Sequence, residues 1–218
     1  MVGFAKKTRG AKTSLLRLPK FNCLVMIKSL LILLFSAAFL AEFAPAADIF
    51  AIDKVHSSMG FQVRHLFSKV EGKFDNFEGT INYDEANPDA SSVEVKIQTV
   101  SIDTGNAQRD ADLKSPNFFD AAKYPEITFK STSVKPTEKN KADVAGDLTM
   151  HGVTKPVVLK VELLGKGPGM KGSIVSGWDA TTSLKRSDFG LSWNKVIEGT
   201  QIVGDDVQID LHVEADKK

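Results

Sequence analysis

The four histidines are the side chains of this chain best suited to acid–base or metal chemistry, and they are scattered. His56, His65, His151 and His212 form no H-E-x-x-H motif and no Cys/His pair. No G-x-S-x-G segment marks a nucleophile elbow. Carboxylates are plentiful but evenly spread, a pattern typical of a solvated surface. The sequence therefore indicates no catalytic or metal site, and we expect a protein that is not an enzyme.

Three polar features each have more than one interpretation. His65 follows Phe61 and Val63 on one face, so it is either a polar anchor in a cavity or a core histidine bonded to a backbone carbonyl. The second interpretation is favoured because buried polar groups are normally paired. The segment Arg186–Gly190 is either a salt bridge at a strand bend or a site at a cavity mouth. His151, at a strand end, has a turn or capping role as its default.

The segment from Ser101 to Phe129 is a long polar excursion that carries the pair Phe118–Phe119. Residues Asn106–Lys114 lack Gly and Pro, and Asp103–Thr104 offers an N-cap. A second short turn is expected at Asn117–Asp120. Excursions of this length inside a domain are usually lids, binding elements or disordered segments. We therefore expect two short helical pieces at one end of the fold.

The elements that must position these residues are β-strands, because apolar and polar residues alternate from Ile49 onward. Further strands are expected near Phe74–Tyr83 and Ile127–Val134. The alternating segments are Met59–His65, Val93–Gln98, Val144–Met150, Val157–Leu163, Trp178–Leu184 and Val207–Glu214. The turns expected between strands are Asn87–Asp89, Lys135–Pro136, Gly165–Gly169 and Gly204–Asp206.

About eight antiparallel strands with one wet face indicate a barrel or a sandwich. A barrel is favoured, since closure removes exposed strand edges most completely. A barrel of about eight strands can hold one small ligand in its interior. The glycine-rich segment Gly165–Gly169 lacks a strand–loop–helix setting, so we interpret it as a hairpin turn rather than a phosphate cradle.

The N-terminal part has the features of a secretory signal peptide. Lys28 precedes the apolar run Ser29–Ala41, and Ala44–Ala46 supplies an A-x-A cleavage signal. The run is short for a membrane span, which disfavours an uncleaved anchor. We expect residues 1–46 to be removed and residues 47–218 to form one exported domain. Residues 1–25 are either a long basic n-region or an over-extended start, because Met26 would make an ordinary signal-peptide beginning.

Removal of residues 1–46 changes the charge of the chain. They hold seven of the 28 basic and one of the 27 acidic residues, which leaves 21 basic and 26 acidic residues and a net charge of −5. Nucleic acid is not expected as a partner, because phosphate binding needs clustered positive charge. The single cysteine, Cys23, lies before the apolar run, so the exported domain has no disulfide and no thiol chemistry.

The exported part resembles the YceI-like family, the lipocalin-like polyisoprenoid-binding proteins of the bacterial periplasm. The resemblance covers essentially all of it, in order. It is carried by Asp53–Ser57, Val63–Leu66, Val70–Phe74, Ser101–Thr104, Arg109–Asp110, Leu113–Ser115, Phe118–Asp120, Tyr124–Phe129, Gly146–Pro156 and Arg186–Gly190.

The resemblance implies an extended eight-stranded antiparallel barrel whose lumen takes an isoprenoid or other long-chain lipid, with no catalytic residues and no further cofactor. The expected partners are that lipid and, transiently, a membrane. Arg109 and Asp110 are expected to hold the excursion over one end of the barrel. The predicted ligand-binding residues are Phe61, Val63, His65, Phe74, Ile97, Leu113, Phe118, Phe119, Phe129, Leu148, Trp178 and Phe189.

Two other functions remain open at this stage. One is an enzyme, or an accessory subunit, that acts on a lipid or quinone through a polar cluster around His65, Arg109 or Arg186. The other is a structural or stress-response protein whose barrel is filled by its own side chains. A continuous cavity would argue against the filled barrel.

Overall fold

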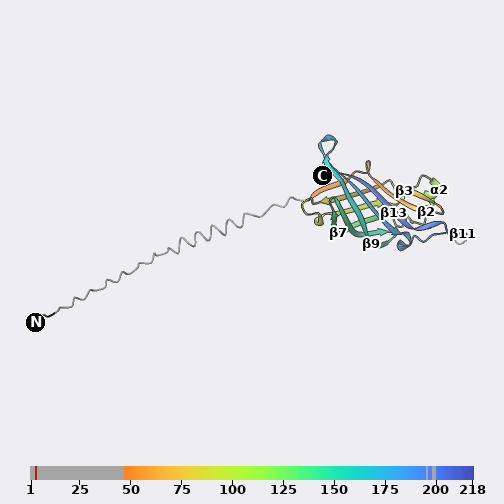
Figure 1. Cartoon of the computed structure of the whole chain (residues 1–218). Coiled ribbons are helices and arrows are strands. Elements are labelled where there is room, and N and C mark those ends of the chain that lie inside the picture. Colours follow the sequence, from red (N-terminus) through yellow and green to blue (C-terminus); the bar gives the residue numbers. More distant parts are fainter. Residues whose placement is uncertain (1–2, 4–46, 195, 198–199) are drawn as a thin grey trace. The chain divides into compact units, whose positions relative to one another are not determined.

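Alternating apolar and polar residues fold into an antiparallel β-barrel in the computed structural model of the chain (Figure 1). The structure describes residues 3, 47–194, 196–197 and 200–218. The predicted signal peptide and its cleavage site therefore lie outside the described residues. Residues from 47 onward belong to one compact unit.

The bounds of the elements follow the chain. The longer strands are β1 (Asp48–Ile52), β2 (Ser58–His65), β3 (Ser68–Phe74), β4 (Phe77–Tyr83), β5 (Ser92–Gln98), β7 (Glu126–Glu138), β8 (Lys141–Met150), β9 (Val153–Pro168), β10 (Ile174–Lys185) and β13 (Val203–Lys217). The short elements are β6 (Ile102–Asp103), β11 (Val196–Ile197), β12 (Thr200–Gln201), the helix α2 (Ala107–Lys114) and the 3₁₀ turns η1 (Pro88–Ala90), η2 (Thr99–Ser101), η3 (Met170–Gly172) and η4 (Arg186–Phe189).

Eight strands close the barrel in the part of the chain that the structure describes. The ring runs β1-β4-β5-β7-β8-β9-β10-β13 and returns to β1. The long strand β13 pairs with β10 along one edge; on its other edge it pairs first with β2, where Phe61 faces Ile209, and then with β1, where Phe50 faces Lys217. Strands β2 and β3 pair with each other and thus lengthen the barrel beyond β1 and β4.

Three predicted turns lie wholly or partly within strands. Gly165–Pro168 form the end of β9 and pair with Ile174–Gly177 of β10, so the β9–β10 connection turns at Gly169 and η3 instead. Pro136 is inside β7 beside a register shift, and the β7–β8 hairpin turns instead at Asn140, whose φ is +63°. A proline is tolerated there because a bulge needs no ladder hydrogen bond from it. The segment Gly204–Asp206 belongs to β13, at the register shift between Val203 and Val207. Residue types that are common in turns therefore occur at β-bulges as well as at the ends of strands.

The excursion contains one α-helix rather than two. The side chain of Asn106 caps α2 by accepting a hydrogen bond from the Arg109 N–H at 3.0 Å, whereas the predicted cap residue Asp103 lies in β6. Hydrogen-bonded turns follow, in which the Phe118 and Asp120 N–H groups both donate to the Ser115 carbonyl. Among the described residues, no helix has the length and apolar character to cross a bilayer.

Arg109 and Asp110 both bond Thr104, which belongs to the same excursion. That they hold this segment over the barrel end stays a prediction. The buried Asp110 carboxylate accepts hydrogen bonds from the Thr104 N–H at 2.9 Å and from its hydroxyl at 2.5 Å. The Arg109 guanidinium donates to the Thr104 hydroxyl oxygen at 2.7 Å and to its carbonyl at 2.8 Å. Charge-assisted bonds of this kind are stronger than neutral ones, so the start of α2 is fixed to the residue that follows β6.

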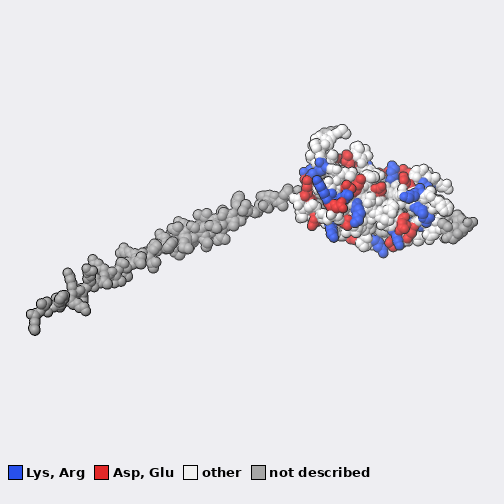
Figure 2. Space-filling view, viewed as in Figure 1, with Lys and Arg blue, Asp and Glu red and all other residues white. Residues whose placement is uncertain are grey.

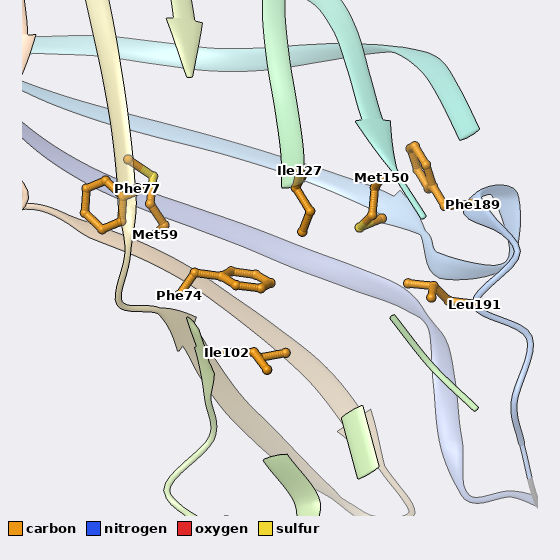
Figure 3. Close-up of a cluster of buried hydrophobic side chains, with 8 residues drawn as sticks. All are labelled: Met59, Phe74, Phe77, Ile102, Ile127, Met150, Phe189 and Leu191. Carbon is orange, nitrogen blue, oxygen red and sulfur yellow. The ribbon is translucent and has the colours of Figure 1, made fainter. Parts of the chain in front are cut away.

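A buried apolar cluster fills the barrel where the excursion meets the strands (Figure 3). Phe74 is at its centre, with its ring 5.8 Å from that of Phe61 and 6.0 Å, edge to face, from that of Phe119. This cluster is referred to below as the packed cluster. Its members are Met59, Phe74, Phe77, Ile102, Ile127, Met150, Phe189 and Leu191.

Candidate functional site

The barrel encloses a cavity of about 610 Å³. The inward-facing residues of β9 show how its wall is built: Val157, Leu159, Val161 and Leu163 line the cavity, and the residues between them face outward. Side chains from the other barrel strands complete an almost wholly apolar wall. Pockets for small molecules usually have volumes of about 300–1,000 Å³, so this lumen is large enough for a ligand.

The cavity is long and narrow. Its wall follows β7 from Ile127 to Glu138, which at about 3.3 Å per residue and a strand tilt of about 40° corresponds to roughly 28 Å along the axis. The volume of about 610 Å³ is thus spread along most of the barrel rather than gathered in one chamber. Such a tube suits a single extended chain better than a compact ligand.

One end of the lumen lies beside the β7–β8 hairpin and carries two aromatic residues with polar neighbours. The rings of Tyr83 and Trp178 meet edge to face at 5.1 Å, and the indole N–H donates to the Ser176 hydroxyl at 2.9 Å. Burial raises the pKa of Tyr83, so its hydroxyl stays neutral. Lys166 lies 5.5 Å from the Tyr83 ring and pairs with Glu85, which raises the pKa of the lysine.

The buried guanidinium of Arg186 lies at the other end of the lumen. It donates to the carbonyls of Gly204 at 2.9 Å, Leu191 at 2.5 Å and Trp193 at 2.8 Å. Burial lowers its pKa, while the nearby charge of Asp205 opposes that shift. The predicted salt bridge with Asp188 is therefore not the main role of Arg186. Its side chain ties the 190–194 segment to β13.

The structure brings ten of the twelve predicted ligand-binding residues together in the lumen wall. Two lie elsewhere. His65 is exposed at the end of β2, beyond the lumen, so neither the cavity anchor nor the core histidine describes it. Phe189 is 2% exposed and belongs to the packed cluster rather than the wall. The ten in the wall are Phe61, Val63, Phe74, Ile97, Leu113, Phe118, Phe119, Phe129, Leu148 and Trp178. That they contact a ligand stays a prediction.

Several lumen residues were not among the predicted ones, although the sequence carried a signal for most of them. Leu159, Val161 and Ile209 follow the same alternation as the chosen positions and could have been found from it. Tyr83 also follows the alternation, at the end of the expected strand Phe74–Tyr83, whereas Leu191 could not have been found because it lies in an irregular segment. Aromatic residues had been preferred over aliphatic ones, while the wall uses both.

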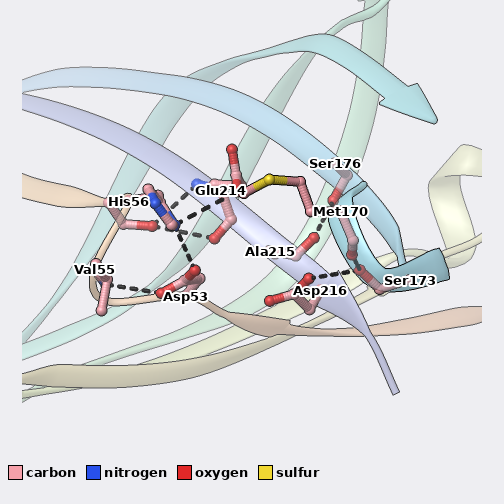
Figure 4. Close-up of polar contacts among 10 residues, drawn as sticks. Asp53, Val55, His56, Met170, Ser173, Ser176, Glu214, Ala215 and Asp216 are labelled. Carbon is pink, nitrogen blue, oxygen red and sulfur yellow. Dashed lines mark hydrogen bonds and ion pairs between the residues drawn. The ribbon is translucent and has the colours of Figure 1, made fainter. Parts of the chain in front are cut away.

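A polar cluster at the break between β1 and β2 offers metal-type ligands (Figure 4). Asp53, His56 and Glu214 place ligand atoms within 4.8 Å of one another. His56 Nδ1 bonds the Asp53 carboxylate at 2.7 Å, which raises the pKa of His56 and lowers that of Asp53. Ser57 exchanges hydrogen bonds with the Glu214 backbone. These contacts tie the break to β13, and they account for the arrangement structurally.

The polar cluster expected of an enzyme is not assembled around His65, Arg109 and Arg186. His65 is exposed, Arg109 is bonded to Thr104, and Arg186 is bonded to three carbonyls. A barrel filled by its own side chains does not agree with the cavity either. The arrangement of the described residues is suited to holding an apolar molecule.

Comparison with known proteins agrees with this architecture. The model of the YceI-like domain matches residues 50–215. The chain belongs to the YceI-like family. It is 45% identical to protein YceI of Escherichia coli O157:H7 over 170 residues. That match covers 76% of this chain and 88% of the other.

Solved structures of the YceI-like kind share the barrel. BcnA of Burkholderia cenocepacia superimposes with a TM-score of 0.68 at 28% identity, covering 75% of this chain and 98% of that one. A polyisoprenoid-binding domain from Saccharophagus degradans, implicated in plant cell wall breakdown, gives a TM-score of 0.57 at 16% identity, covering 78% of this chain and 98% of that one. The second likeness shows the fold alone.

Three segments that carried the family resemblance meet beside the packed cluster. His151 Nδ1 donates to the Phe189 carbonyl at 3.1 Å, and the Tyr124 ring lies 4.6 Å from the imidazole, edge to face. Gly152, with φ of +74°, leaves room for the Tyr124 ring that a Cβ would occupy. His151 therefore has the turn role expected of it. These YceI-like motifs hold three separate segments together.

Proposed function

We propose that this protein binds a polyisoprenoid or another long-chain lipid in its lumen and carries or stores it in the periplasm. The observation that carries the proposal is the long, narrow, apolar cavity. A prenyl or acyl chain is almost entirely apolar surface, and its burial gains about 25 cal/mol per Å². No catalytic group is needed for such binding, only an apolar tunnel with a few polar atoms near its ends.

Two further observations support the proposal. The relative of known structure from Saccharophagus degradans is described as polyisoprenoid-binding, and this chain has the same barrel. The apolar run Ser29–Ala41 with its A-x-A signal supports export to the periplasm. We infer from the same alternating wall that the tail is recognised loosely, because apolar contacts discriminate a single methylene only weakly.

The test is organic extraction of the purified native protein followed by mass spectrometry. We expect one class of long-chain lipid in amounts comparable to the protein. Leu159→Trp puts a bulky ring into the lumen and should lower the lipid content severalfold. Val158→Trp is the matched control, because Val158 is the next residue of β9 and faces outward. Absence of long-chain lipid from the folded native protein would sink the proposal, as would equal lipid content in the two variants.

A further inference from the structure

The tip of the β2–β3 hairpin presents a fully exposed aromatic ring. Phe67 is 100% exposed, at the turn where Leu66 has a φ of +50°. The turn itself is fixed, since the Leu66 N–H donates to the Ile202 carbonyl at 2.8 Å. A lone apolar side chain on a surface is ordinary and would carry no inference by itself. The surroundings of Phe67 are therefore decisive.

Two more apolar side chains lie exposed in the segment beside this hairpin. Val196 is 59% exposed and Trp193 is 37% exposed. Val196 pairs with Gln201, whose carbonyl accepts a hydrogen bond from Arg64 of the hairpin at 3.4 Å. Figure 1 shows β11, β2, β3 and α2 gathered at the end of the barrel away from the C-terminus. We call Phe67, Trp193 and Val196 the apolar tip.

The apolar tip is continuous with the end of the lumen. The Trp193 ring lies 5.0 Å from the ring of Phe118, and Phe118 lines the cavity. Leu191, two residues before Trp193, lines the cavity as well, as does Val203. A lipid that leaves the lumen at this end would therefore pass along the apolar tip.

The charge around the tip differs from that of the whole domain. Residues 47–218 have a net charge of −5, yet residues 54–70 contain no Asp or Glu and include Arg64 and Lys69 on either side of Phe67. Residues 189–197 contain no acidic residue either, although Asp188 and Glu198 flank them in the sequence. Elsewhere, on the face shown in Figure 2, charges of both signs are interspersed. Basic residues beside exposed aromatic side chains fit an anionic lipid surface.

We propose that the apolar tip docks onto an anionic membrane surface and that lipid passes between bilayer and lumen at this end. Trp and Phe prefer the boundary between headgroups and hydrocarbon, which suits Trp193 and Phe67. A second copy of the chain could also cover such a tip, but the lumen ending beside it favours a lipid source. The passage of lipid rests on the proposed function, whereas the docking is measured on its own.

The first test is flotation of the exported domain with vesicles that contain phosphatidylglycerol and phosphatidylcholine. We expect binding that falls roughly tenfold or more in Phe67→Ser, because one aromatic side chain leaves the apolar phase. Met170→Ser is the matched control. Met170 is also highly exposed, at 85%, but lies in the β9–β10 connection near the C-terminal end of β13, and its substitution should leave binding unchanged. Equal effects of the two substitutions, or no binding by the native domain, would overturn the docking.

The second test places the tip directly in the bilayer. Trp178→Phe leaves Trp193 as the one tryptophan of the chain, and lipids brominated near the headgroup should then quench its fluorescence. Unquenched Trp193 fluorescence would overturn docking onto the bilayer. A dimer that forms without vesicles and is lost in Phe67→Ser would show instead that a second copy of the chain covers the tip. The lumen-blocked variant Leu159→Trp separates the two proposals, because it should still dock. Loss of docking with normal lipid content refutes this inference alone, and docking without lipid content refutes the proposed function alone.

Discussion

The packed cluster and the lumen wall are built from the same kinds of residue on the same alternating strands and share members such as Phe74, yet the interior is closely packed beside η4 and open along the rest of the barrel. Phe189 and Ile102, which do not line the cavity, are each 2% exposed, whereas Leu159 and Val161 in the lumen wall are only partly buried. The difference comes from what crosses the barrel. The excursion and η4 bring side chains into one end, while the β7–β8 end has, among the described residues, only hairpins and short turns. Alternation thus determines which residues point inward but not whether the interior is filled.

The difference in packing between the two regions can be tested most directly by truncating one side chain in each. Phe189→Ala should cost about 3–5 kcal/mol of the free energy of unfolding, because it leaves a void in a close-packed cluster. Leu159→Ala should cost about 1 kcal/mol, since its side chain already borders a cavity and loses little burial. Urea unfolding of the lipid-free protein measures both. Equal losses would mean that the lumen is as tightly packed as the cluster.

A second pair of substitutions tests which hydrogen bonds hold the packed end of the barrel together. Arg186→Met removes the hydrogen bonds that hold three carbonyls near the lumen, and we expect a loss of about 2–3 kcal/mol of unfolding free energy. Arg109→Met is the matched control, because Arg109 is exposed and bonds only Thr104, so it should cost about 1 kcal/mol or less. Urea midpoints at constant slope measure the two. If Arg109→Met lowers the free energy of unfolding more than Arg186→Met does, the excursion rather than Arg186 holds this end together.

The smallest effect concerns the polar junction between β1 and β2, outside both regions. The hydrogen bond to Asp53 raises the pKa of His56 above its ordinary value near 6.5. The stabilisation that it brings is fully present below about pH 6.5 and is lost as the pH rises through the raised pKa. Asp53→Asn should return the pKa of His56 toward 6.5, followed by NMR titration of the imidazole.

His212 supplies the internal control for that titration. Its pKa is raised by Asp179, at 2.7 Å on the neighbouring strand, and Asp53→Asn should leave it unchanged. A His56 pKa that does not move would show that Glu214, 3.7 Å away, dominates the junction instead.

Much of the fold could be predicted from the sequence, because a barrel repeats one local rule. The inward positions of β9, β10 and β13 follow from alternation alone, and the lumen wall follows from them. The number of alternating segments gave about eight strands, and the cost of exposed strand edges favoured a barrel over a sandwich; the family resemblance then implied the closed eight-stranded barrel. His65 was misplaced because alternation continues to the end of β2, while the barrel interior ends before it. The local pattern of apolar and polar residues does not indicate where along a strand the lumen ends.

The rest depended on contacts between distant segments. Phe189 follows the strand β10 and was expected beside a ligand, but the hydrogen bond from His151 to its carbonyl and the Arg186 bonds turn it into the packed cluster. The cap of α2 was placed at Asp103–Thr104 because both residues are good caps; Asn106 takes that role since Asp103 is already paired with Lys73 across β3 and β6. Contacts with distant segments therefore decided which of several suitable residues caps α2.

The pairing of β13 has a kinetic consequence. One strand late in the domain bonds to β10, β2 and β1, and its last contacts join Phe50 to Lys217. The barrel therefore cannot close until the most distant segments of the domain meet, which requires a large loop-closure entropy before any closing contact forms. We expect slow folding in which the β7–β10 hairpins form first and closure by β13 is the late step. A chain awaiting that step would expose its lumen wall to water, and a chain-like lipid present at that moment could be enclosed as the barrel closes.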